Sequence, residues 1–101
     1  MALTLKLQPY LEERIKYLLS KQGDSDKFFN EILQYKISEM EKAIFNIEKD
    51  LRKFEKKYNQ SSSEFYKRFE SGELGDEDDY MIWAGIYETY IKNKEELKKL
   101  K

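Results

Sequence analysis

The sequence predicts a mainly helical fold with one short strand near the N-terminus. The composition favours helix, because the 101 residues include only one proline and four glycines, and 39% of them are charged. Apolar residues recur at helical spacing through most of the chain. The exception is the segment from Leu3 to Leu7, where leucine alternates with polar residues as in a half-buried strand.

The alternating segment places Leu3, Leu5 and Leu7 on one face, and Thr4 and Lys6 on the other. A strand of this length is not stable alone in water, and the rest of the chain reads as helix. The same strand from a second copy would solve this problem by forming a two-stranded antiparallel ribbon across a dimer axis. The alternative is an N-terminal arm that packs on the chain's own helices.

Two helices are expected after Pro9. The first is amphipathic and should stop at Gly23, because glycine readily adopts the left-handed conformation that ends helices. Asp24 or Ser25 is a suitable N-cap for the second helix. That helix is expected to run to about Tyr58, because residues 26–58 contain neither glycine nor proline.

The second helix carries an unbroken heptad seam. Its apolar residues are separated alternately by four and three positions, as in a coiled coil. This spacing predicts a coiled coil, formed either with a second chain or with another helix of the same chain. A core helix in a monomeric bundle is the alternative. The seam consists of Leu33, Ile37, Met40, Ile44, Ile47, Leu51, Phe54 and Tyr58.

The C-terminal part begins at the polar break 59–63, where Ser62 or Ser63 can cap a short helix. An acidic loop with two glycines follows. A last helix with one broad, aromatic-rich face is expected from about Glu77 toward Lys101.

The composition limits which catalytic and metal-binding side chains the protein can have. The chain has no histidine and no cysteine, and its net charge is −1, divided as +2 for residues 1–60 and −3 for residues 61–101. The acidic run Asp76 to Asp79 offers oxygen ligands, but a solvated helix N-terminus explains it more simply. We therefore expect no enzyme activity, no cofactor and no metal site. No apolar run is long enough to span a membrane, and no signal peptide is evident, which predicts a cytoplasmic protein.

The N-terminal residues also carry a resemblance. A strand, a short helix, a Gly-x-Ser turn and a second helix follow one another within residues 2–45. This order resembles the ribbon-helix-helix fold of DNA-binding repressors of the Arc, MetJ and CopG type. The residues that carry it are Leu3 to Pro9, then Leu11, Ile15, Leu18 and Leu19, then Gly23 and Ser25, then Phe28, Phe29, Ile32 and Leu33.

The resemblance implies a homodimer that binds operator DNA. Ala2, Thr4 and Lys6 would face base edges in the major groove, and Ser25 with Lys27 would hold a phosphate at the start of the second helix. The chain departs from the pattern in two ways. Ala2 is too short for strong readout, and the aspartates on either side of Ser25 would repel a phosphate.

The C-terminal half resembles the tails of small prokaryotic antitoxin-type proteins. The run 63–76 carries this resemblance, together with Asp79, Tyr80 and Trp83. It implies that an acidic, aromatic region binds a cognate protein toxin. The alternative is that the aromatics form a core of the chain's own. The predicted partner-binding residues are Phe65, Tyr66, Phe69, Asp76, Asp79, Tyr80, Trp83, Tyr87 and Tyr90.

The sequence thus predicts three regions. Residues 1–45 would form the ribbon-helix-helix DNA-binding and dimerisation module, 46–60 a coiled-coil extension of its second helix, and 61–101 a helical toxin-binding region. The expected function is that of an antitoxin and transcriptional regulator. The alternative is a helical coiled-coil interaction or scaffold protein that does not bind DNA.

Overall fold

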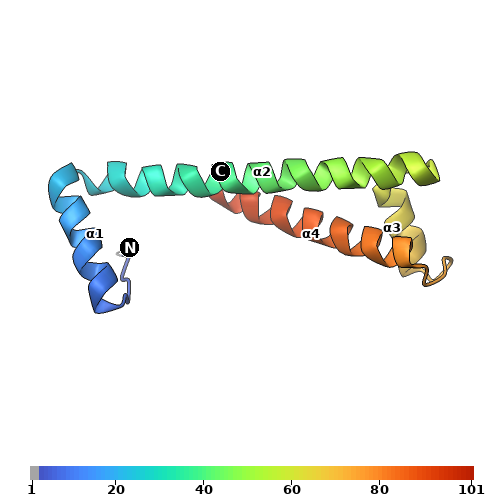
Figure 1. Ribbon diagram of the computed structural model, residues 1–101, viewed down its shortest axis with the longest axis horizontal. Coiled ribbons are helices and arrows are strands. Elements are labelled where there is room, and N and C mark those ends of the chain that lie inside the picture. The colour runs from blue at the N-terminus through green and yellow to red at the C-terminus, as the bar shows by residue number, and fades with distance from the viewer. Residues whose placement is uncertain (1–2) are drawn as a thin grey trace. The chain divides into compact units, whose positions relative to one another are not determined.

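The computed structural model describes residues 3–101, and all regular structure in that range is helical (Figure 1). The chain divides into two compact units, Met1–Tyr35 and Lys36–Lys101, and the division falls within α2. The helices are α1 (Pro9–Gln22), α2 (Ser25–Tyr58), α3 (Ser62–Glu70) and α4 (Asp78–Leu100).

The predicted ribbon-helix-helix fold is wrong. Residues 3–8 form neither strand nor helix, and no strand occurs anywhere in residues 3–101. Leu3 and Leu5 are 79% and 54% exposed, so the segment does not pack as a buried arm either. The physical reason is that alternating apolar and polar residues determine only which side chains share a face. They supply no second strand for the backbone to bond with, and a lone strand is unstable. The mainly helical part of the prediction is confirmed.

Local signals place the helix boundaries of the first unit. Pro9 occupies the first turn of α1, where its missing N–H costs nothing. Gly23 ends the helix in the left-handed conformation, with φ at +76°, and donates its N–H to the carbonyl of Leu19 at 3.0 Å. The side chain of Asp24 accepts a hydrogen bond from the N–H of Lys27 at 3.3 Å, as an N-cap does. The expected helix stop at Gly23 is therefore confirmed.

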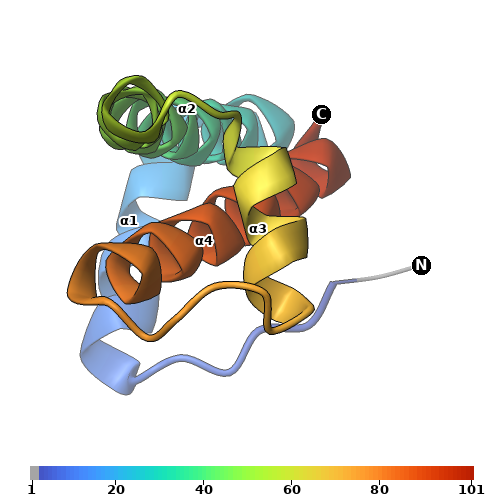
Figure 2. The same cartoon turned by 90° about the vertical axis from the view of Figure 1, so that its right-hand side faces the viewer.

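The second unit is a helical hairpin closed at one end. α4 runs back along the second half of α2, and α3 crosses between them at the closed end (Figures 1 and 2). Its core is the cluster Leu51, Phe65, Trp83 and Ala84. Further apolar and aromatic side chains pack against this cluster, namely Ile47, Phe54, Tyr58, Tyr66, Phe69, Leu74, Tyr80, Ile86, Tyr87 and Tyr90.

Part of the heptad seam is buried within this unit. Ile37, Ile44 and Leu51 are the buried residues of α2. Farther along, Phe54 and Tyr58 stack on Trp83 of α4, with ring centres 5.6 and 5.7 Å apart. At this end an aromatic side chain of the chain's own α4 therefore covers the seam, while coiled-coil packing stays a prediction.

Candidate functional site

The first unit exposes an uncovered apolar surface. No residue from 3 to 36 is buried, and α1 has no buried residue although its apolar positions form an amphipathic stripe. We call this set of exposed side chains the N-terminal apolar surface. It consists of Leu3, Leu5, Leu7, Tyr10, Leu11, Tyr17, Leu18, Phe29, Ile32 and Leu33.

The size of this surface can be judged against known interfaces. Added together, the exposed fractions of its ten residues equal roughly five fully exposed side chains. At about 200 Å² for each large side chain, this is an exposed area of about 1,000 Å². A stable protein–protein interface buries about 800 Å² on each partner. The surface is therefore large enough to serve as one side of such an interface.

The predicted DNA-contacting residues that the structure describes lie in two segments of the first unit. Ala2 lies outside the described residues, while Thr4 and Lys6 lie in the non-helical segment before α1. Ser25 is the first residue of α2, and the N–H of Lys27 is already taken by the carboxylate of Asp24. A phosphate at this helix end would have to displace that carboxylate.

Two of the seven predicted toxin-binding aromatics lie in the protein's own core, and the other five pack around them. Phe65 and Trp83 are fully buried, and their rings stack 3.8 Å apart and almost parallel. The indole N–H of Trp83 donates to the hydroxyl of Ser62 at 2.9 Å, so the most buried polar group of the core has a partner. Tyr66, Phe69, Tyr80, Tyr87 and Tyr90 are half-buried around this pair. In this conformation the stacked pair is not accessible to a partner.

The two acidic residues of the predicted toxin-binding set have different surroundings. Asp76 is exposed in the α3–α4 loop. The carboxylate of Asp79 accepts hydrogen bonds from the Lys57 ammonium at 2.6 Å and from the Tyr58 hydroxyl at 2.5 Å. These two bonds hold the pKa of Asp79 below its usual value and raise the pKa values of Lys57 and Tyr58. Asp79 therefore ties the first turn of α4 to the end of α2.

A second carboxylate–phenol contact links α3 and α4. The hydroxyl of Tyr66 donates to Glu88 at 2.6 Å. Hydrogen bonding to Glu70 and Glu88, reinforced by partial burial, raises the pKa of Tyr66. This contact lies on the rim of the core and is structural in character.

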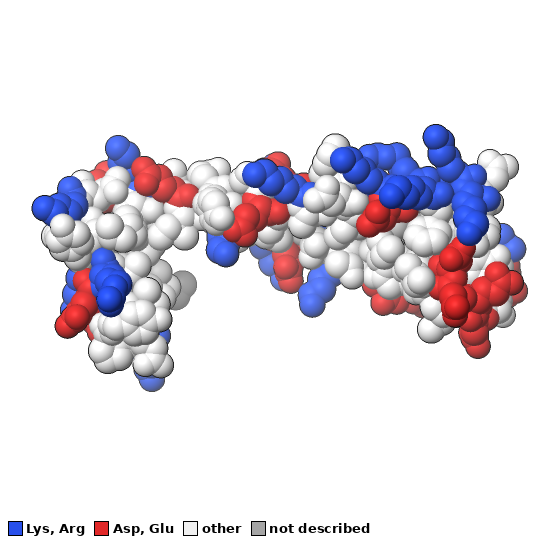
Figure 3. Space-filling model, viewed as in Figure 1, with Lys and Arg blue, Asp and Glu red and all other residues white. Residues whose placement is uncertain are grey.

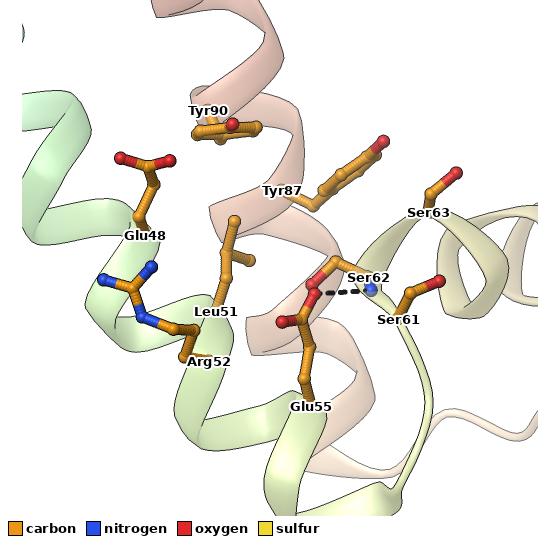
Figure 4. Close-up of a pocket in the computed structure, with 9 residues that line it drawn as sticks. All are labelled: Glu48, Leu51, Arg52, Glu55, Ser61, Ser62, Ser63, Tyr87 and Tyr90. Carbon is orange, nitrogen blue, oxygen red and sulfur yellow. Dashed lines mark hydrogen bonds between the residues drawn. The ribbon is translucent and has the colours of Figure 1, made fainter.

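A groove of about 280 Å³ opens between α2 and α4 beside the start of α3 (Figure 4). The N-terminus of a helix can attract an anion, and here Glu55 fills that role, since its carboxylate accepts the N–H of Ser62 at 2.8 Å. The groove is thus a junction whose helix N-terminus is already occupied. Its lining residues are Glu48, Leu51, Arg52, Glu55, Ser61, Ser62, Ser63, Tyr87 and Tyr90.

The face of α2 opposite the buried seam is cationic. Figure 3 shows Lys and Arg side chains gathered over the second half of α2, whereas Asp and Glu gather at the α3–α4 loop. Nearby carboxylates are engaged elsewhere, Glu55 with Ser62 and Glu41 with Lys101 at 3.1 Å. Within residues 3–101, no ion pair involves a residue of this cationic stripe, which consists of Lys42, Lys49, Arg52, Lys53 and Lys56.

In the described part of the chain, no group of three or more acidic residues is placed to hold a metal ion. None of the helices there has the length and apolar character needed to cross a bilayer. Comparisons with protein-family models, curated proteins and solved structures found no match for this chain.

Proposed function

We propose that this chain is a non-catalytic interaction protein that associates with a protein partner through the N-terminal apolar surface. The observation that carries the proposal is that no residue from 3 to 36 is buried, although this stretch holds eleven large, exposed hydrophobic side chains, ten of which make up that surface. Large apolar patches on a folded protein are typical of interaction sites. The second unit is the folded body that the first unit would attach to its partner.

The contrast between the two units supports this assignment. The second unit buries Phe65 and Trp83 completely, while the first unit leaves Leu18 48% exposed. Burying apolar surface stabilises a protein by about 25 cal/mol per Å², so covering about 1,000 Å² would contribute on the order of 25 kcal/mol before the costs of association. The costs of association offset much of this term, so the area supports an apolar interface but does not by itself give an affinity.

Dye binding tests the proposal. At concentrations where the chain is monomeric, we expect the apolar dye ANS to bind and its fluorescence to rise. A variant with Leu11→Ser and Leu18→Ser should lose most of this rise. The matched control carries Met81→Ser and Ile82→Ser on α4, which are similarly exposed in the second unit, and should keep most of it.

The control decides how the dye experiment is interpreted. If the monomer binds no dye, the N-terminal surface is not available and the proposal is wrong. If both variants lose the signal equally, the dye does not distinguish this surface from ordinary exposed apolar side chains. Far-UV circular dichroism of both variants checks that their helices are intact.

A second candidate function is favoured by the cationic stripe. The five side chains extend over about 21 Å of helix, and they lack carboxylate partners within ion-pair distance. A basic stripe along a helix is the electrostatic footprint of a surface that contacts phosphates. The predicted binding of DNA is therefore proposed for this face of α2, as contact with the duplex backbone.

Toxin neutralisation and a cytoplasmic location stay predictions from the sequence. A toxin that binds this conformation would contact exposed residues such as Asp76 and the N-terminal apolar surface, because Phe65 and Trp83 are enclosed. Nothing in the geometry favours an enzymatic role over these two binding roles.

A further inference from the structure

We propose that the partner on the N-terminal apolar surface is a second copy of this chain, and that the two α1 helices meet antiparallel. This inference rests on the proposed function, since it names the occupant of the same surface. Two observations support it, namely the area available and the order of side chains along one flank of α1.

The area suits a symmetric dimer only if the interface extends beyond α1. The four residues of the surface that lie on α1 expose about 400 Å², and a standard interface needs about 800 Å² from each side, so the leucines before α1 or the apolar residues at the start of α2 must take part as well. In a two-fold dimer the same patch is used twice, so a single uncovered surface is sufficient. Two-fold dimers are also the commonest assemblies of soluble proteins.

The flank of α1 beside the apolar stripe has a self-complementary order. Tyr10, Arg14, Tyr17 and Lys21 follow one another at spacings of four, three and four residues, so they form one ridge along the helix. Within the chain, Arg14 lies over the ring of Tyr10 and Lys21 over the ring of Tyr17, each 5.4 Å from the ring centre. The ridge therefore alternates ring and cation along its length.

An antiparallel two-fold pairing matches this ridge to itself. A two-fold axis at right angles to the helices brings the same flank of both copies together, with one copy reversed. Reversal about the middle of Pro9–Gln22 places Tyr10 opposite Lys21 of the second copy, and Arg14 opposite Tyr17 of the second copy. Each ring then meets a cation from the other chain, and such contacts are more favourable once they are desolvated.

The apolar stripe of α1 fits the same arrangement. Leu11, Ile15 and Leu18 share the face next to this ridge, and Ile15 lies near the middle of the helix. In the antiparallel pair, Ile15 lies near the two-fold axis. Leu11 of one copy then lies toward the C-terminal end of the other copy's α1, and Leu18 lies toward its N-terminal end. Apolar contact thus lies at the centre and the ring–cation pairs lie beside it, as in typical interfaces.

Sedimentation of the full chain tests the identity of the partner. We expect a monomer–dimer equilibrium, and a variant with Leu11→Glu and Leu18→Glu should weaken it at least about a hundredfold, because two apolar contacts near the centre of the interface are lost. The control with Met81→Glu and Ile82→Glu should dimerise like the unmodified chain. A chain that stays monomeric at all concentrations overturns the inference, although dye binding by that monomer would leave the proposed function standing.

Disulfide cross-linking tests the antiparallel arrangement. The chain has no cysteine, so single substitutions give clean reporters. A chain with Tyr10→Cys and a chain with Lys21→Cys should form a disulfide with each other when they are mixed, but neither should cross-link with itself. In the antiparallel pair the same residue in the two copies would be about 16 Å apart along the helix, and a disulfide needs Cα atoms within about 7 Å. Cross-linking of either variant with itself, or none in the mixture, would overturn this geometry.

Discussion

The hydrogen bond between Ser62 and Trp83 offers the sharpest test of how the second unit is held together. Trp83 is fully buried and Ser62 is 3% exposed, and the 2.9 Å bond between them satisfies the indole N–H inside the core. Replacing Ser62 by Ala removes the acceptor but leaves the donor buried. We expect this substitution to destabilise the fold more than the loss of an ordinary surface contact would.

The magnitude follows from the burial of the donor. A buried donor without a partner costs about 1–3 kcal/mol, so Ser62→Ala should lower the free energy of unfolding by about 2 kcal/mol. For a unit of this size, each kcal/mol corresponds to about 4–8 °C in Tm, which gives a drop of roughly 10 °C. Ser63→Ala is the matched control, because Ser63 is exposed in the same turn, and its effect should stay within about 0.5 kcal/mol.

Urea unfolding measures this effect directly. Trp83 is the only tryptophan in the chain, so its fluorescence reports on this core, and circular dichroism at 222 nm follows the helices of every variant. Adding Trp83→Phe, alone and with Ser62→Ala, completes a double-mutant cycle that isolates the bond from the change in ring size. If Ser62→Ala unfolds at the same urea concentration as Ser63→Ala, the bond contributes nothing and the reasoning fails.

Two further predictions concern charged groups. Hydrogen bonds, first from Lys57 and then from Tyr58, lower the pKa of Asp79, so this carboxylate stabilises the fold above a pH of about 4 and its contribution is lost as the pH falls through the lowered pKa. The difference in unfolding free energy between the native chain and Asp79→Asn should therefore shrink on acidification. Urea midpoints measured across pH test this, and a difference that stays constant would contradict it. If the cationic stripe contacts duplex DNA, the logarithm of Kd should rise with the logarithm of salt concentration at a slope of about 4.5, that is about 0.9 for each of five contacts. A variant of the stripe should bind DNA at least about tenfold more weakly, while a control variant of α4 with the same loss of charge should bind it almost normally. Equal losses in the two variants would refute the assignment to duplex DNA. The assignment would also fail if poly-glutamate competed for the stripe as well as duplex DNA does. The stripe variant changes Lys42, Lys49, Lys53 and Lys56 to Gln, and the control changes Lys92, Lys94, Lys98 and Lys99 to Gln.

Helix boundaries could be predicted because their signals are local. Pro9 and Gly23 act within one turn of their own position and mark the two ends of α1. The polar break also marks the start of α3, although its N-cap is Ser61 and not Ser62 or Ser63, the predicted caps. At the start of α3, for example, the Ser61 hydroxyl accepts the N–H of Glu64 at 3.2 Å. Such contacts join residues three or four positions apart, so both partners can be found within one short stretch of sequence.

Pairing between distant segments could not be predicted in the same way. The alternation of Leu3, Leu5 and Leu7 is compatible with a strand, but a strand needs a neighbour that local pattern does not supply. The contact of Ser62 with Trp83 joins residues 21 positions apart and has no counterpart in spacing or composition. Likewise, periodicity indicates the aromatic face of α4 but does not say whether a partner or the chain itself covers that face.

The long α2 helix shows how one sequence pattern can have two outcomes. The heptad seam continues without a break from Leu33 to Tyr58, yet Leu33 is 37% exposed while Leu51 is 5% exposed. The difference is the supply of a covering helix. α4 has 23 residues, and its end lies beside Glu41, where Lys101 bonds to that carboxylate, so it covers the part of the seam that lies in the second unit. The pattern indicates which side chains can face inward, whereas their burial depends on a covering helix. In the first unit no residue from 3 to 35 is buried, so the apolar residues at the start of α2 and those of α1 need a partner to cover them.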